Sequence, residues 1–70
     1  MNSSNYTTKY QAIAYIGMQT RFGRRIIESM MDKLETEGKI SFTKGLDKKS
    51  LLISMEDIQK VIDELQQYPR

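Results

Sequence analysis

The stretch from residue 20 to residue 40 has the amphipathic pattern of a long helix. At about 100° per residue, its apolar side chains fall within roughly half a turn of the helix wheel. These side chains are Phe22, Ile26, Ile27, Met30, Met31 and Leu34. Gly38 is expected to end the helix, because glycine readily takes the left-handed conformation that follows a helix C-terminus. The pattern predicts one helix over residues 20–37, on which the other elements must pack.

The first turns of this predicted helix carry three arginines, Arg21, Arg24 and Arg25. Residues at i, i+3 and i+4 are neighbours on a helix surface, so the three guanidinium groups form one cationic patch. A positive patch at a helix N-terminus opposes the helix dipole, which favours anions there. The patch is either an ordinary solvated face or, as we expect, a surface that meets a polyanion such as the phosphates of a nucleic acid.

The composition excludes most catalytic and metal chemistry. With 70 residues, the chain has room for one domain with a marginal core. It contains neither cysteine nor histidine, which excludes disulfides, thiol and histidine catalysis, and the usual zinc sites. We therefore expect no enzyme activity, no cofactor and no metal. Because no apolar run is long enough for a membrane span or a signal peptide, we expect a cytoplasmic protein without a membrane partner.

Charge is unevenly distributed along the chain, although the net charge is only +2. Residues 1–49 contain nine Lys/Arg and five Asp/Glu, whereas residues 50–70 contain two and four. This asymmetry predicts that the first part of the chain meets an acidic partner and that the last part faces elsewhere.

A first helix is expected before the long one. Thr8 and Gln11 have capping-box spacing, which predicts a helix near residues 8–16. Gly17 is expected to end this helix in the left-handed conformation. Residues 1–5 are polar and are expected to form a disordered tail.

A very short connection joins the two predicted helices. Residues 17–19 form this connection, and Thr20 is a suitable N-cap for the long helix. Two helices joined by about three residues that include a glycine form the helix-turn-helix pattern. Gly23 falls on the apolar side of the long helix, where its missing side chain allows a close approach to Ala14. The alternative is that this glycine has no structural role.

The residues after the long helix predict a β-hairpin, because apolar and polar side chains alternate there. A half-buried strand is expected at residues 39–44 and a second apolar strand at residues 50–54. Because two strands alone are barely stable, the hairpin must pack on the helices. The side chains expected to make this contact are Ile40, Phe42, Leu51 and Ile53.

A last helix begins where Ser54 and Asp57 repeat the capping spacing, and it ends before residues 68–69. Its apolar stripe consists of Ile58, Val61, Ile62 and Leu65. The stripe either packs on the small core or contributes to the seam of a dimer. The residues with the spacing of such a seam are Ile58, Val61, Leu65 and Tyr68.

Four segments follow one another in a characteristic order. They are AYIGM at residues 14–18, RRI at residues 24–26, EGKI at residues 37–40 and LISMEDI at residues 52–58. In this order and spacing they resemble the small excisionase and MerR-like DNA-binding families. The fold class implied is mainly α with a small β-hairpin (α+β), a compact winged helix-turn-helix domain over residues 6–68. The expected order is helix, turn, helix, hairpin wing and helix.

The resemblance implies binding to double-stranded DNA, with the helix at residues 20–37 in the major groove and the wing at residues 44–49 on the backbone or in the minor groove. The residue types agree, because arginine contacts guanine or phosphate and lysine suits phosphate. Leu46 either inserts into a minor groove or packs onto Phe42. The predicted DNA-contacting residues are Gln19, Thr20, Arg21, Arg24, Arg25, Lys44, Lys48 and Lys49.

Two functions are consistent with these patterns. The first is a sequence-specific DNA-binding protein, either a small transcription regulator or an excisionase-like architectural factor of a mobile element. One domain with so few basic contacts is expected to bind as a homodimer or as a cooperative array. The alternative is a winged-helix protein-interaction module, such as an inhibitor, an adaptor or a plasmid partition component, that uses its acidic C-terminal helix.

Overall fold

The computed structural model describes residues 5–68, so residues 1–4 of the tail predicted at residues 1–5 lie outside this range. Within the range, Asn5 is tied to the fold, because its carbonyl oxygen accepts a hydrogen bond from the Met55 N–H at 2.8 Å. Three helices and a small antiparallel sheet form the α+β class that the sequence predicts. In chain order the elements are β1 (Tyr6–Thr8), α1 (Lys9–Thr20), α2 (Arg24–Thr36), β2 (Thr43–Lys44), β3 (Leu51–Ser54) and α3 (Met55–Gln66).

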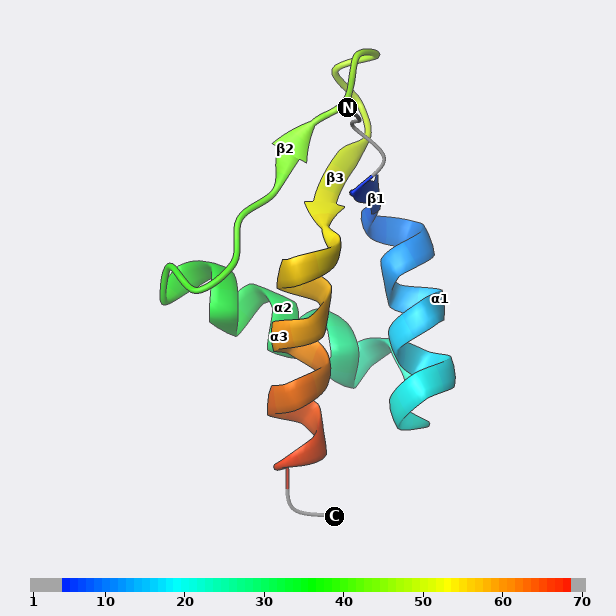
Figure 1. Cartoon of the computed structure of the whole chain (residues 1–70), viewed down its shortest axis with the longest axis vertical. Helices are drawn as coiled ribbons and strands as arrows, with labels where there is room; N and C mark the ends of the chain where they lie inside the picture. The colour runs from blue at the N-terminus through cyan, green and yellow to red at the C-terminus, as the bar shows by residue number, and fades with distance from the viewer. Residues whose placement is uncertain (1–4, 69–70) are drawn as a thin grey trace.

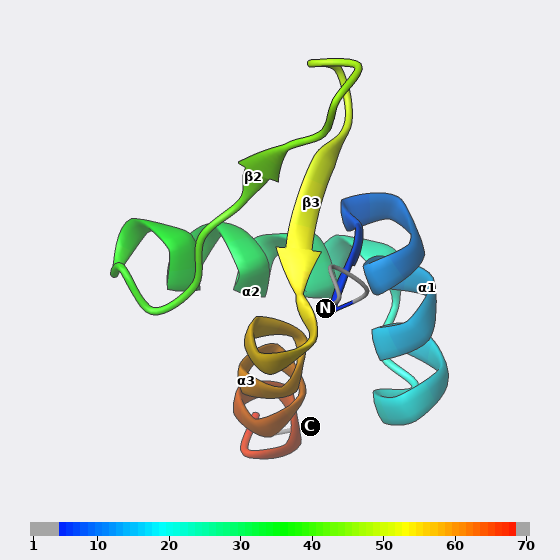
Figure 2. The ribbon, with the colours of Figure 1, turned by 45° about the horizontal axis from the view of Figure 1, so that its top comes forward.

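The three helices pack on one another around a single core (Figure 1). α1 and α3 run side by side, and α2 crosses both of them, while the hairpin of β2 and β3 extends from one end of the molecule (Figures 1 and 2). The core consists of Ala12, Ile13, Ile16, Ile27, Met30, Met31, Leu34, Ile40, Ile53, Ile58, Val61, Ile62 and Leu65. Within residues 5–68, none of the helices combines the length and the apolar character that crossing a bilayer requires.

Both predicted capping signals are confirmed. The Gln11 N–H donates to the hydroxyl of Thr8 at 3.1 Å, and the Asp57 N–H donates to the hydroxyl of Ser54 at the same distance. A capping hydroxyl of this kind satisfies one of the amide groups that a helix leaves unpaired at its start. Gly38, with φ +79°, adopts the left-handed conformation after α2, as its position predicts.

The predicted boundary between the first two helices is wrong. α1 continues through Gly17 to Thr20, and Arg21 takes the left-handed conformation with φ 66°. The Arg21 N–H closes the helix end by donating to the carbonyl of Gly17 at 2.8 Å. α2 therefore begins at Arg24, four residues later than predicted, and Gly23 is its N-cap.

The close packing that the sequence assigned to Gly23 belongs to Gly17 instead. A Cβ atom added to Gly23 would meet nothing within 4 Å, so the predicted close approach to Ala14 is wrong. A Cβ atom on Gly17 would instead lie 3.6 Å from the Ile27 side chain and from the Phe22 carbonyl. The glycine that faces the neighbouring helix is thus the one expected to end α1.

The apolar stripe of α3 belongs to the core of the single chain. Ile58, Val61 and Leu65 are at most 1% exposed, so a dimer seam built from them is wrong. Tyr68 is 47% exposed, and its ring makes an edge-to-face contact with Phe22 at 6.0 Å between centroids. In a domain of this size every apolar helix face is needed for the core, which leaves no stripe of α3 for a partner.

The hairpin is a part of a three-stranded sheet of order β1-β3-β2. β2 is shorter than predicted. β1, which the sequence did not predict, pairs with β3 in the register Tyr6↔Ser54. Ile40 and Ile53 are buried as expected and Phe42 is partly buried, but Leu51 is exposed because it begins β3 at the end farther from α3.

Candidate nucleic-acid interface

Arg24 and Arg25 occupy the first turn of α2, where both side chains are exposed. The Nε of Arg24 donates to Glu28 Oε2 at 3.1 Å, a pair one helical turn apart on the surface. The Arg24 guanidinium also lies over the ring of Tyr10 in α1, 5.5 Å from its centroid. Surface pairs of this kind contribute little to stability. They orient the arginine, and its guanidinium group stays at the surface.

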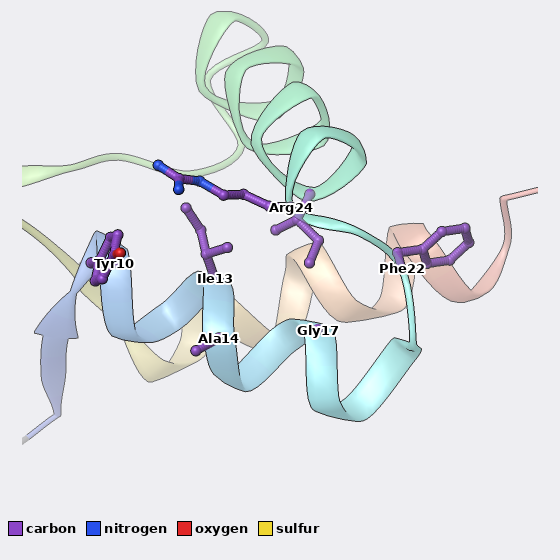
Figure 3. Close-up of a pocket in the computed structure, with 7 residues that line it drawn as sticks. Tyr10, Ile13, Ala14, Gly17, Phe22 and Arg24 are labelled. Carbon is purple, nitrogen blue, oxygen red and sulfur yellow. The ribbon is translucent and has the colours of Figure 1, made fainter.

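Arg24 reaches back along α1 towards its N-terminal turn (Figure 3). There it lines a shallow depression together with residues of α1, the end of the hairpin turn (Lys49 and Ser50) and Leu51, the first residue of β3. Lys9 and Lys49 contribute the other two positive charges, and Glu28 is the acidic group of the lining. The structure therefore places Arg24 and one lysine of the hairpin on a common exposed surface, which we call the basic depression.

Lys9 and Tyr10 were not predicted as site residues. The Nζ of Lys9 lies 5.0 Å from the centroid of the Phe42 ring, which holds the side chain between α1 and the hairpin. Tyr10 is 72% exposed, and its ring, with the Arg24 guanidinium over it, forms part of the lining of the basic depression. No spacing pattern in the sequence marks these two residues, because their place depends on how α1 packs against α2 and the sheet.

Arg25 faces a second depression, away from the basic one. The lining of this second depression comes from α2 and includes Ile26 and Lys33, together with Tyr68 beyond the end of α3. Successive helical residues lie about 100° apart, so neighbouring arginines need not share a surface. The predicted single patch of three arginines is therefore divided.

Three predicted contacts lie at the end of α1 instead of on α2. Thr20 is buried, and its hydroxyl donates to the Ile16 carbonyl at 2.8 Å and accepts from the Phe22 N–H at 3.3 Å. It neither caps α2 nor reaches the surface, so its assignment to a DNA contact is wrong. Gln19 is exposed in the last turn of α1, and Arg21 is exposed in the connection that follows.

The tip of the hairpin is an ordered turn that carries exposed lysines. Asp47 Oδ1 accepts hydrogen bonds from the N–H groups of Lys49 and Ser50, both at 3.0 Å. These bonds, first that of Ser50 and then that of Lys49, lower the pKa of the Asp47 carboxyl below its ordinary value. Lys48 adopts a left-handed conformation with φ 61°, and Lys44 is exposed in β2.

Leu46 projects from this tip with its side chain completely exposed. Packing of Leu46 onto Phe42 is therefore wrong, and Phe42 is covered by Lys9 instead. An ordered turn that presents an apolar side chain beside lysines has the residue types that enter DNA minor grooves.

The acidic part of the chain leads away from the hairpin, since α3 extends towards the opposite end of the molecule (Figure 1). At the start of α3, Asp57 Oδ2 accepts a hydrogen bond from the Ser41 N–H at 3.1 Å, which ties the loop before β2 to the helix. Within residues 5–68 no group of three His, Cys, Asp or Glu side chains is placed to hold a metal ion. Comparison of the chain with protein-family models, with curated proteins and with solved structures gives no match.

Proposed function

We propose that the chain is a sequence-specific double-stranded DNA-binding protein, acting as a small transcription regulator or as an excisionase-like architectural factor. The observation that carries the proposal is the basic depression, in which Arg24 from α2 and Lys49 from the hairpin share one exposed surface. Two elements far apart in the sequence thus present positive charge together, as simultaneous contact with a groove and an adjacent backbone requires.

The first turn of α2 enters the major groove in this proposal. Arg24 exchanges Glu28 for a guanine edge or a phosphate, and the length of its side chain allows this without movement of the helix. Glu28 then disfavours binding wherever Arg24 finds no such partner, because an unpaired carboxylate faces the DNA. The same pair therefore contributes to discrimination between sites as well as to attraction.

The hairpin acts as the wing. Lys44, Lys48 and Lys49 neutralise phosphates, and Leu46 enters the minor groove between them. The Asp47 hydrogen bonds keep the tip in one conformation, which lowers the entropy that binding must remove.

The test is a fluorescence-anisotropy titration with a duplex selected from random sequences. Arg24→Ala is expected to weaken binding to the selected site more than binding to unrelated duplexes, and Arg25→Ala, whose side chain faces the second depression, is expected to do so to a smaller extent. Lys48→Ala is expected to weaken all duplexes alike and to lower the salt slope by about 0.9. Lys60→Ala in α3 is the matched control, because it removes the same charge from the helix that faces away from the hairpin.

If none of the first three substitutions changes binding relative to the control, the proposal is wrong. Tight binding to a protein with no DNA affinity at low salt would instead favour an interaction module. For that alternative α3 offers its charged side, because the apolar stripe of α3 is buried in the core.

A further inference from the structure

The second depression, on the side of α2 that Arg25 faces, differs from the basic depression in its charges. The described residues that line it include two cations and no acidic side chain. They are Arg25, Ile26, Ser29, Met30, Lys33 and Tyr68. In the basic depression, by contrast, Glu28 belongs to the lining and pairs with Arg24. None of the ion pairs within residues 5–68 involves Arg25 or Lys33, so the fold does not neutralise the charge of the second depression.

The cations and the apolar side chains of this depression follow neighbouring rows along α2. Arg25, Ser29 and Lys33 are four residues apart and form one ridge, and Ile26 and Met30 belong to the next. Arg25 and Lys33 are separated by about 12 Å along the helix axis, because each residue of a helix adds about 1.5 Å. The second depression therefore offers an apolar strip beside two positive charges about two helical turns apart.

The core does not cover the whole of this apolar strip. Ile26 belongs to the predicted apolar side of α2, yet it is 40% exposed, whereas Ile27 is 1% exposed. Tyr68 is 47% exposed, and its edge-to-face contact with Phe22 positions the ring at the margin of the depression. Arginine, methionine and tyrosine are enriched at protein interfaces. The second depression thus has the composition of a protein-binding site with an aromatic wall already in position.

We propose that the second depression binds an acidic amphipathic helix of another protein. Two carboxylates about two turns apart on that helix pair with Arg25 and Lys33, and a bulky apolar side chain between them packs on Ile26. Charge complementarity selects this occupant, because an uncharged or basic segment would leave both cations unpaired at the contact. A nucleic-acid backbone would pair with the cations, but its phosphates and sugars offer no large apolar group to Ile26. The proposal goes beyond DNA binding, since the two depressions share no lining residue.

The first experiment identifies the chemistry of the partner. The full chain is used to select from a phage-displayed library of random peptides, each about four helical turns long. The enriched peptides are expected to carry two carboxylates about two turns apart with a bulky apolar residue between them on the same helix face. Failure to enrich any peptide, or enrichment of peptides without acidic residues, overturns the proposal.

The second experiment locates the contact by anisotropy titrations of an enriched peptide at physiological salt, where distant charges are screened. Lys33→Glu is expected to weaken binding at least about tenfold, because it places one carboxylate against another. Lys44→Glu is the matched control, since it reverses the same charge in β2, outside the depression, and should leave peptide binding nearly unchanged.

A second pair of variants tests the apolar strip without a change of charge. Ile26→Thr is expected to weaken peptide binding roughly fourfold through the loss of apolar contact. Leu51→Thr is its control, because Leu51 has a similar exposed fraction of 37% and lies in β3. Circular dichroism verifies that each variant is folded.

The outcomes separate this proposal from the DNA-binding proposal. Equal effects of Lys33→Glu and Lys44→Glu on the peptide, or unchanged binding by Ile26→Thr, overturn the peptide site. The same variants are titrated with duplex DNA, and a loss of duplex binding in Lys33→Glu as large as its loss of peptide binding would assign the depression to nucleic acid instead. A chain that binds the peptide and no duplex contradicts the proposed function and leaves the peptide site intact.

Discussion

The helices α2 and α3 begin in opposite ways. α3 begins after Ser54, whose hydroxyl caps the helix, and two acidic residues follow in its first turn. α2 begins after Gly23, which makes no side-chain cap, and Arg24 and Arg25 follow. The first arrangement suits the helix dipole, whereas the second opposes it. The difference teaches that the start of α3 serves stability, while the start of α2 carries positive charge that folding does not need.

The same contrast extends to tertiary contacts. Asp57 in the first turn of α3 accepts the Ser41 N–H and lies 3.5 Å from Lys60 Nζ, so it joins the helix to the preceding loop. Arg24 in the first turn of α2 has only the exposed contacts with Glu28 and Tyr10 among those described above. Contacts of the first kind hold the fold together, and contacts of the second kind can be exchanged for a ligand.

The largest effect is expected when the two arginines at the start of α2 are replaced by acidic residues, like those at the start of α3. The double substitution Arg24→Glu with Arg25→Glu should weaken DNA binding on the order of 100-fold, because the cation of the basic depression and its neighbour in the first turn of α2 both become anions. The free energy of unfolding should change by less than about 1 kcal/mol, since a better helix dipole is offset by repulsion from Glu28. Anisotropy titrations and urea unfolding measure the two quantities. A parallel loss of binding and stability would show that the substitutions act through the fold.

Removal of the cap of α3 should have a smaller effect, on stability instead of binding. Ser54→Ala is expected to lower the free energy of unfolding by about 1 kcal/mol, because the Asp57 N–H loses its acceptor. For a domain of this size the melting temperature falls by about 4–8 °C per kcal/mol. Thr8→Ala should behave alike, and Ser29→Ala on the surface of α2 is the control. Unchanged melting of the Ser54 variant would contradict the role of the cap.

A cap given to α2 should produce a still smaller change of opposite sign. Gly23→Ser is expected to raise the free energy of unfolding by a few tenths of a kcal/mol, because its backbone is extended and its surroundings are open. Gly38→Ser provides the contrast, with a loss of about 1 kcal/mol, because φ there is +79°. Thermal melting distinguishes the two variants. Destabilisation by both would mean that Gly23 has a role its open surroundings do not reveal.

The smallest effect expected is a loss of stability of the hairpin tip at low pH. The pKa of Asp47 is lowered from 3.8 by the N–H groups of Ser50 and Lys49, so the folded state favours the ionised carboxylate. Its contribution to stability is present above pH 3.8 and is lost as the pH falls through the lower pKa of the folded state. Asp47→Asn should remove this part of the acid dependence. Amide chemical shifts of residues 45–50 followed during an acid titration provide the measurement, and identical titration of the variant would exclude Asp47 as the cause.

Patterns that depend on near neighbours were predicted well. The caps at Thr8 and Ser54, the buried stripe of α3, the left-handed Gly38 and the hairpin all follow from spacing within a few residues. The end of α1 was not predicted, because glycine is the usual left-handed residue and Arg21 takes that role here. The burial of Thr20 against the core decided the boundary, and burial depends on residues that are distant in the chain.

The sequence by itself determined the α+β class, the apolar stripe of α3, and the starts of two helices. These features arise from local propensity and periodicity, which act wherever the segment lies. Only the tertiary structure decided that β1 joins the sheet, that the apolar stripe of α3 is buried in the core, and that Lys9, Arg24 and Lys49 line one depression. Each of these is a contact between segments far apart in the chain, so packing of the whole domain selects it.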